Sequence, residues 1–247
     1  MRARRSITAH MRRILAVLLL AATAVALAGC AGVDGQKAEG LLLQADAAQK
    51  ALTSEQFSMR ENVTADGMSV DMQMAGGGYL KGAQAGDVYL MMTGQSPDGK
   101  SMDATVVKRG DQIVVSADGQ RQEMSAAQLQ QQYGGQLQSM LGGGFDFAQY
   151  VKSVKVSDTT LPNGDPADQI VGVLDTQSAA DSLTKGLGLG GLAKFGDTRA
   201  VLTISRKTHL VTAALIDMNM QVLGKKMTIS LTYGLTGVNV PINFPAA

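Results

Sequence analysis

A short alternation in the N-terminal half most narrowly constrains how this chain folds. From Met68 to Met74 the sequence is MSVDMQM, with an apolar residue at every even number and a polar one at every odd number. Successive side chains of a β-strand point to opposite sides, so this period of two predicts a strand with one apolar face. That face is mostly methionine, although valine, isoleucine and phenylalanine are the usual apolar residues of strands.

The first 29 residues predict an export signal. Five arginines precede an apolar run from Ile14 to Leu27, and small residues follow it. A basic start, a short apolar run and small residues before a cleavage point are typical of secretory signals. The run has about 14 residues, whereas a membrane-spanning helix needs roughly 20.

Residues Leu27–Cys30, with the sequence LAGC, resemble a bacterial lipobox. The resemblance implies cleavage before Cys30, a diacylglyceryl group on its sulfur and anchoring to the outer face of the cell membrane. Cys30 is the only cysteine, so no intramolecular disulfide can form. An ordinary signal peptide followed by an incidental cysteine is the alternative. We therefore expect a lipoprotein signal peptide (1–29), a lipidated tether (30–36) and one domain (37–247).

The charge balance argues against nucleic acid as a partner. Residues 1–29 contain five arginines and no acidic residue, so 17 of the 22 basic residues remain against 21 acidic ones, a net charge of −4. The mature chain therefore has no basic excess with which to bind phosphates. Its 218 residues suit a single domain.

The chain after the tether predicts a helix followed by many short strands. Leu41, Ala45, Ala48 and Leu52 recur at helical spacing. Turn residues separate the alternating segments that follow, and loops of a few residues imply an antiparallel meander. The expected strands are Phe57–Ala65, Met68–Ala75, Asp87–Thr93, Ser101–Lys108, Gln112–Ala117, Gln169–Asp175, Thr198–Arg206, Leu210–Val222 and Lys226–Tyr233, and an extended segment then ends at Pro245.

Further helices are expected between these strands. Ser125–Gln128 fits a capping box and opens an apolar stripe that continues to Met140. Asp146 is expected to cap a second helix, whose apolar stripe runs to Val154. Ser178 begins a third, shorter helix. We therefore predict an α+β fold in which helices gather against one face of an antiparallel sheet.

Two glycine patterns match nucleotide-binding motifs but lack the context that such motifs need. Gly94–Ser101 fits G-x-x-x-x-G-K-[ST], yet a phosphate-binding loop requires a helix after the lysine, and an alternating segment follows here. We interpret it as a hairpin turn. Gly186, Gly188 and Gly191 fit G-x-G-x-x-G but follow an expected helix instead of a strand. We interpret them as a glycine-rich loop.

The sequence offers little for catalysis or metal binding, and we expect neither an enzyme nor a cofactor. His209 is the only histidine after residue 29, and its surroundings, RKTHL, predict a turn between two strands. The chain has no nucleophile-elbow motif. Its aspartates are scattered along the sequence, whereas metal sites need clustered ligands.

Methionine is the unusual component of the predicted sheet. Twelve of the 14 methionines follow residue 29, against five phenylalanines and no tryptophan. The sequence VDMQM (Val70–Met74) recurs as IDMNM (Ile216–Met220), and these residues can lie together on one side of the sheet. Methionine either fills an irregular core or lines a surface that adapts to guests of different shape. The residues alone leave both interpretations open.

The order of elements resembles the mycobacterial lipoprotein family that includes LppX, LprA, LprF and LprG, which is similar to the LolA-type lipoprotein carriers. A lipobox, one amphipathic helix, a meander, an inserted helical segment and closing strands carry the resemblance over about residues 36–245, most closely in Thr198–Pro245. It implies a curved antiparallel half-barrel with helices on its concave side and an apolar cavity for acyl chains.

In that setting the methionine-rich side becomes the wall of a lipid cavity. The residues expected to line it are Met68, Val70, Met72, Met74, Val88, Leu90, Met92, Ile216, Met218, Met220, Ile229 and Leu231. The implied function is a membrane-anchored carrier or chaperone of acylated glycolipids or phospholipids across the cell envelope, with an envelope transporter as a candidate partner. The alternative is a non-transporting sensor or accessory lipoprotein that uses the same fold to bind a protein.

Overall fold

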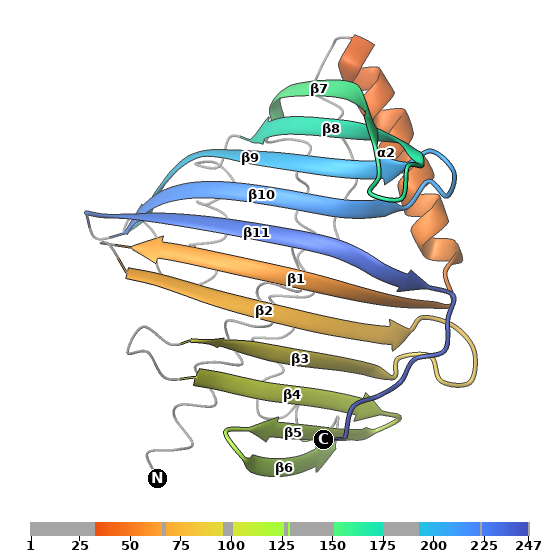
Figure 1. Cartoon of the computed structure of the whole chain (residues 1–247), viewed down its shortest axis with the longest axis vertical. Coiled ribbons are helices and arrows are strands. Elements are labelled where there is room, and N and C mark those ends of the chain that lie inside the picture. The colour runs from red at the N-terminus through yellow and green to blue at the C-terminus, as the bar shows by residue number, and fades with distance from the viewer. Residues whose placement is uncertain are drawn as a thin grey trace.

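A computed structural model describes residues 33–65, 68–95, 101–125, 128, 151–174, 193–222 and 224–246. Most of these residues belong to one long helix and a single 11-stranded sheet (Figure 1). The elements are α2 (Val33–Ala51), β1 (Ser54–Ala65), β2 (Met68–Tyr79), β3 (Val88–Gln95), β4 (Ser101–Arg109), β5 (Gln112–Ala117), β6 (Gln120–Ser125), β7 (Val151–Thr160), β8 (Pro166–Leu174), β9 (Ala193–Ser205), β10 (Val211–Val222) and β11 (Lys225–Val238).

The sheet is antiparallel throughout and its strand order is β6-β5-β4-β3-β2-β1-β11-β10-β9-β8-β7. Every neighbour in the sheet is also a neighbour in sequence, except for β1 and β11. These two strands pair at the centre, so the first and last strands of the chain hold the two halves of the sheet together. Figure 1 shows the result as one open, curved layer with β6 and β7 at its edges. The expected antiparallel sheet is confirmed.

Turn residues separate the strands where the sequence predicts. Asp118 and Gly119 form a two-residue connection between β5 and β6, and both have positive φ angles, of 51° and 75°. Two positive φ values are what a type I′ hairpin turn requires, and Asp-Gly is a preferred sequence for it. The strand that follows this turn, β6, was not expected, because its sequence QRQEMS has no regular apolar alternation.

Several element boundaries differ from the expectations. Helix α2 begins at Val33, so residues 33–36, which were assigned to the tether, are helical. Residues 151–154, expected at the end of a helix, instead begin strand β7, which pairs with β8 along its whole length. Valine favours strands over helices because its branched β-carbon restricts χ1, and Val151, Val154 and Val156 all lie in this segment.

Other expected elements lie wholly or partly outside the described residues. These are the helix from Leu129 to Met140, residues 146–150 of the second helix, the short helix at Ser178, and the glycine-rich loop. The start of the first of them is described. The backbone N–H of Ser125 donates to Oε1 of Gln128 over 2.7 Å, and the backbone N–H of Gln128 donates to Oγ of Ser125 over 3.1 Å. These two bonds confirm the predicted capping box.

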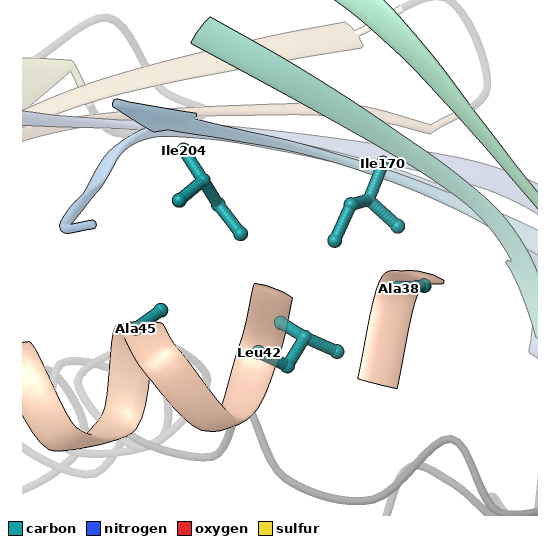
Figure 2. Packing of buried hydrophobic residues seen from close by; sticks show 5 residues of the cluster. All are labelled: Ala38, Leu42, Ala45, Ile170 and Ile204. Carbon is teal, nitrogen blue, oxygen red and sulfur yellow. The ribbon is translucent and has the colours of Figure 1, made fainter. Parts of the chain in front are cut away.

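Helix α2 packs against the strands at one end of the sheet. Its buried residues Ala38, Leu42 and Ala45 contact Ile170 of β8 and Ile204 of β9. Figure 2 shows Ile170 and Ile204 pointing from the sheet toward the helix. Leucine and isoleucine each contribute roughly 1.5–3 kcal/mol when they are fully buried. This cluster therefore fixes the helix on one face of β7–β9.

The C-terminal segment crosses the opposite face of the sheet. After β11 the chain runs past β2, β3 and β4 toward β5 (Figure 1). Phe244 lies against Tyr79 and Tyr89, with ring centroids 6.2 and 5.9 Å apart, and the guanidinium carbon of Arg109 lies 4.8 Å from the centroid of the Phe244 ring. The backbone N–H of Ile242 donates to the hydroxyl of Tyr79 over 2.9 Å. The expected extended end of the chain is confirmed.

An ionic cluster links α2 to the sheet beside the apolar contacts. Arg206 donates to both carboxylate oxygens of Asp168, each over 2.8 Å, and also pairs with Asp158. Lys37 of α2 lies 3.5 Å from the same Asp168 carboxylate, which is nearly buried. The hydrogen bonds from Arg206 lower the pKa of Asp168 below its ordinary value, although burial opposes the shift.

The low pKa of Asp168 predicts a loss of stability in acid. The folded state holds this carboxylate ionised to a lower pH than the unfolded chain does, so the stabilisation is present above the unfolded pKa of about 4 and is lost as pH falls through the lower folded pKa. Urea unfolding of the wild type and Asp168→Asn at pH values from 7 to 3 measures this. We expect the difference in unfolding free energy to be largest at pH 7 and to shrink below about pH 4.

The matched control for this experiment is Asp111→Asn, which changes an exposed aspartate in the turn between β4 and β5. A difference between wild type and Asp168→Asn that stays constant across the pH range would contradict the assigned role of the Arg206–Asp168 pair.

Candidate functional site

The residues predicted to line a cavity lie on one face of the sheet, here called the methionine face. Directly paired residues form a row across the sheet from β3 to β9, namely Met92, Met74, Met59, Tyr233, Ala214 and Leu202. Leu202 packs against the cluster that holds α2. Since paired residues and residues two apart share a face, the methionine face is the one that carries α2.

The structure brings eleven of the twelve predicted positions onto this face. Met74, Leu90 and Leu231 are buried, with 3%, 7% and 4% of their surface exposed. Val88 is 41% exposed. Met68 lies in β2 opposite Ala65, and its side chain falls outside the described part of the structure. Seven of the positions are half-buried: Val70, Met72, Met92, Ile216, Met218, Met220 and Ile229.

A buried cluster occupies the centre of the methionine face. Met59, Met74, Leu90 and Leu231 form it, and Phe57, Met92, Val106, Ile216 and Tyr233 pack around them. Met59 and Phe57 were not predicted as site residues. Their strand, β1, alternates less cleanly than β2, because Glu61 takes a position where an apolar residue would continue the pattern. Both residues nonetheless have odd numbers in β1, and this shared parity could have assigned them to the methionine face.

Two strand glycines make room for large side chains on this face. A Cβ atom at Gly76 would lie 2.5 Å from Cζ of Phe57, so the Phe57 ring lies across the glycine. A Cβ atom at Gly94 would lie 3.1 Å from Cγ of Met72. Glycine in a strand often marks such a close approach. The Phe57 ring also stacks on Tyr233, with centroids 6.1 Å apart, and so extends the apolar surface from β2 to β11.

At the centre of the methionine face the polar side chains are mostly buried. Glu61 is 8% exposed and Thr198 is 1% exposed. Burial, together with the charge of Glu55, raises the pKa of Tyr233 to about 12, so its hydroxyl stays neutral at physiological pH. Burial also raises the pKa of Glu55, and a hydrogen bond from Gln49 of α2 partly offsets that effect.

Over the central strands, the opposite face of the sheet is polar. Cross-strand pairs hydrogen-bond along β1, β2, β10 and β11: Arg60 with Asp71, Asn62 with Ser69, Ser230 with Asp217, and Thr228 with Asn219. Such pairs stabilise neighbouring strands by a few tenths of a kcal/mol to about 1 kcal/mol each. The central strands therefore separate a solvated surface from an apolar one, as the alternation at Met68–Met74 predicts.

Two surface hollows are found in the described residues. One, of about 420 Å³, lies where β10 meets β9 and β11, and is lined by Gly196, Asn219, Met220, Gln221, Lys226, Met227 and Thr228. The other, of about 370 Å³, lies beside β5 and β6 and is lined by Asp111, Gln112, Glu123, Met124, Ser125 and Gln128. Met220 is thus the predicted cavity residue that borders a hollow, but most of that hollow is lined by residues of the opposite face, among them Asn219, Gln221 and Thr228.

The segment Gly94–Ser101 and His209 lie between strands, as the sequence predicts. Gln95 at the end of β3 pairs directly with Ser101 at the start of β4, so the segment from Gly94 to Ser101 joins two antiparallel strands and the hairpin interpretation is confirmed. His209 lies exposed in the turn between β9 and β10, with a φ angle of 58°. The described ranges contain no group of three or more residues that could hold a metal ion.

Neither a protein-family model nor a curated protein matches this chain. Solved structures do. The crystal structure of LprF from Mycobacterium bovis is 15% identical, covers 87% of this chain and 99% of its own, and has a TM-score of 0.44. MucB in complex with MucA(peri) is 13% identical over 81% of this chain and 54% of its own, with a TM-score of 0.30. A DUF1329 family protein from Desulfovibrio piger is 9% identical over 83% and 92%, with a TM-score of 0.29.

LprF is among the proteins that the order of elements resembles, so the expected resemblance is confirmed as a similarity of structure. In the described ranges, no helix combines the length and the apolar character needed to cross a bilayer.

The assignment of faces predicts different costs for two methionines. Met74 is buried in the central cluster, whereas Met91, on the adjacent strand, points to the opposite face and is half-buried. We expect Met74→Ala to lower the unfolding free energy by about 2–4 kcal/mol and Met91→Ala by less than about 1 kcal/mol. Urea unfolding at pH 7 measures both, and equal costs would show that the two faces are wrongly assigned.

Proposed function

We propose that this chain is an envelope lipoprotein that binds the acyl chains of lipids or glycolipids on its methionine face and carries or chaperones them across the cell envelope. The observation that carries the proposal is the continuity of that face. Apolar and aromatic side chains of β3, β2, β1 and β11 follow one another across the centre of the sheet, through Met92, Met74, Met59 and Tyr233, and seven of the predicted positions remain half-buried.

The physical basis of binding is the removal of apolar carbon from water. An acyl chain laid along half-buried methionines buries surface on both partners, at about 25 cal/mol per Å² of apolar area. Methionine is unbranched and flexible, so the same wall can fit chains of different length and shape. The polar opposite face keeps the loaded protein soluble, and no covalent step is needed. We therefore propose a carrier and not an enzyme.

The anchor follows from the lipobox at Leu27–Cys30. Two acyl chains on Cys30 hold a protein stably at a membrane, whereas one chain holds it only marginally. Helix α2 begins at Val33, three residues after Cys30, and three residues span about 10 Å when extended. The domain would therefore remain close to the outer surface of the cell membrane, where it could accept a lipid from the bilayer or from a transporter.

One observation favours a second function. Met59, Met74, Leu90 and Leu231 are buried at the centre of the face, and a filled centre suits a structural core as well as a ligand site. In that case the protein would be a sensor or accessory lipoprotein that binds a protein partner and carries no lipid. The two functions differ in whether the purified protein contains lipid.

The test is mass spectrometry of organic extracts from the purified protein, comparing wild type with Met72→Asp and Met220→Asp. Both methionines are half-buried on the methionine face. A carboxylate at either position would be desolvated by a bound acyl chain, so we expect each variant to lose at least about nine-tenths of the lipid, which corresponds to about 1.4 kcal/mol.

The matched controls change exposed neighbours on the opposite face, Gln73→Asp and Asn219→Asp. They add the same charge and should leave loading unchanged. Cys30→Ala should release the protein from membranes without altering the amount of lipid bound by the domain. Absence of lipid in the wild type, or equal loading in Met72→Asp and Gln73→Asp, would eliminate the carrier and favour the sensor.

A further inference from the structure

The side of helix α2 that faces away from the sheet carries no charged residue. Ala38, Leu42 and Ala45 are buried against β8 and β9. At about 100° per residue, the positions opposite them form a line along the whole helix, here called the outer stripe. It consists of Val33, Gln36, Gly40, Leu43, Ala47 and Ala51.

The large apolar residues of the outer stripe are unusually exposed. Val33 is 86% exposed and Leu43 is 54% exposed, the two highest values for large hydrophobic residues in the described part of the chain. A Cβ atom at Gly40, between them, would meet no atom within 4 Å. Single exposed apolar residues are ordinary on protein surfaces, but these lie on one line that contains no charge. The outer stripe therefore has the character of a contact surface.

The lysines of α2 lie beside the outer stripe, and each is paired with an aspartate. Lys37 lies 3.5 Å from the carboxylate of Asp168, and Lys50 lies 2.6 Å from that of Asp46. The helix therefore offers no cluster of free cations with which to bind anionic headgroups. The contact that it can make is apolar.

The lipobox places a membrane next to the outer stripe. Val33 lies three residues after Cys30, a span of about 10 Å when extended. A contact held by so short a tether is intramolecular, with an effective concentration in the millimolar range, so a few apolar side chains suffice to make it. Amphipathic helices at a membrane surface bury their apolar side by roughly 5–10 Å.

We infer that the outer stripe of α2 lies on the membrane that carries the anchor, so that the methionine face is turned toward the bilayer. The inference rests on the proposed function, because it requires a lipidated Cys30. Leu42 and Ala45 point from the helix toward the sheet (Figure 2). Since α2 packs on the methionine face, the outer stripe points away from the sheet on that same side. The anchoring bilayer is then the source of the acyl chains.

The test uses tryptophan fluorescence, because the chain has no tryptophan of its own. Lipidated Gln36→Trp and Leu43→Trp are reconstituted into phosphatidylcholine vesicles with or without bromine on the acyl chains, since bromine quenches nearby indoles. We expect brominated vesicles to remove most of the emission of both variants. The two positions lie roughly 10 Å apart along the helix, so quenching of Gln36→Trp alone would indicate an upright helix and contradict the inference.

Two controls identify what the indole meets. Gln73→Trp changes an exposed residue on the opposite face, and its emission should persist. Leu43→Trp combined with Cys30→Ala can still take up a brominated lipid but is not held at the membrane, so its emission should persist as well. This second control separates the bilayer from a lipid that the protein carries.

The outcomes distinguish the inference from the proposal on which it rests. If mass spectrometry finds no diacylglyceryl group on Cys30, the proposed anchor fails and the inference fails with it. With the anchor present, three results would overturn the inference alone: equal quenching of Leu43→Trp and Gln73→Trp, quenching of Leu43→Trp that persists without the anchor, or no quenching of either. The last result is expected if the outer stripe binds a protein partner. In all three cases, the lipid extracted from the wild type still decides whether the protein is a carrier.

Discussion

The pairing of β1 with both β2 and β11 is the constraint on which the rest of the structure depends. From Phe57 to Ala65, β1 pairs with both neighbours without a register shift. A slip of one residue would turn every side chain of a strand to the other face. The register therefore places Met59 beside Met74 and Tyr233, and aligns the two methionine-rich segments, which are more than 140 positions apart in sequence, on one side.

This arrangement gives the sheet two surfaces with different tasks. The face opposite the methionine face is covered by cross-strand polar pairs and, over β2–β4, by the C-terminal segment with Phe244. The methionine face carries α2 at one end, held by Leu42 and by the ionic cluster at Asp168. Between α2 and the β3 side of the sheet lies the surface to which we assign lipid binding. Its flexible side chains fit a ligand that is mostly hydrocarbon.

The sequence predicts the central strands and their faces well, for a physical reason. In an antiparallel sheet with one solvated side, apolar residues that alternate with polar ones point away from the solvent. Met72 and Met218 could therefore be assigned to the same face before their pairing was known. Helix α2 was predictable from its apolar spacing, although its start at Val33 was not, because residues 33–36 contain no apolar stripe. Strand β7 was mistaken for a helix end, since apolar residues three and four apart fit a helix, and pairing with β8 overrides that local pattern. Met74 is buried, whereas Met72 is half-buried. This difference depends on tertiary packing, which alternation cannot reveal.

Photolabelling tests the central claim most directly, namely that hydrocarbon chains lie against the methionine face. The protein is loaded with phosphatidylcholine that carries a diazirine on one acyl chain, irradiated, digested and analysed by mass spectrometry. We expect adducts on side chains of the methionine face, such as Met72, Met92 and Met218. Adducts confined to the opposite face, at residues such as Arg60, Gln73 and Ser230, or labelling no greater than that of unfolded protein, would contradict it.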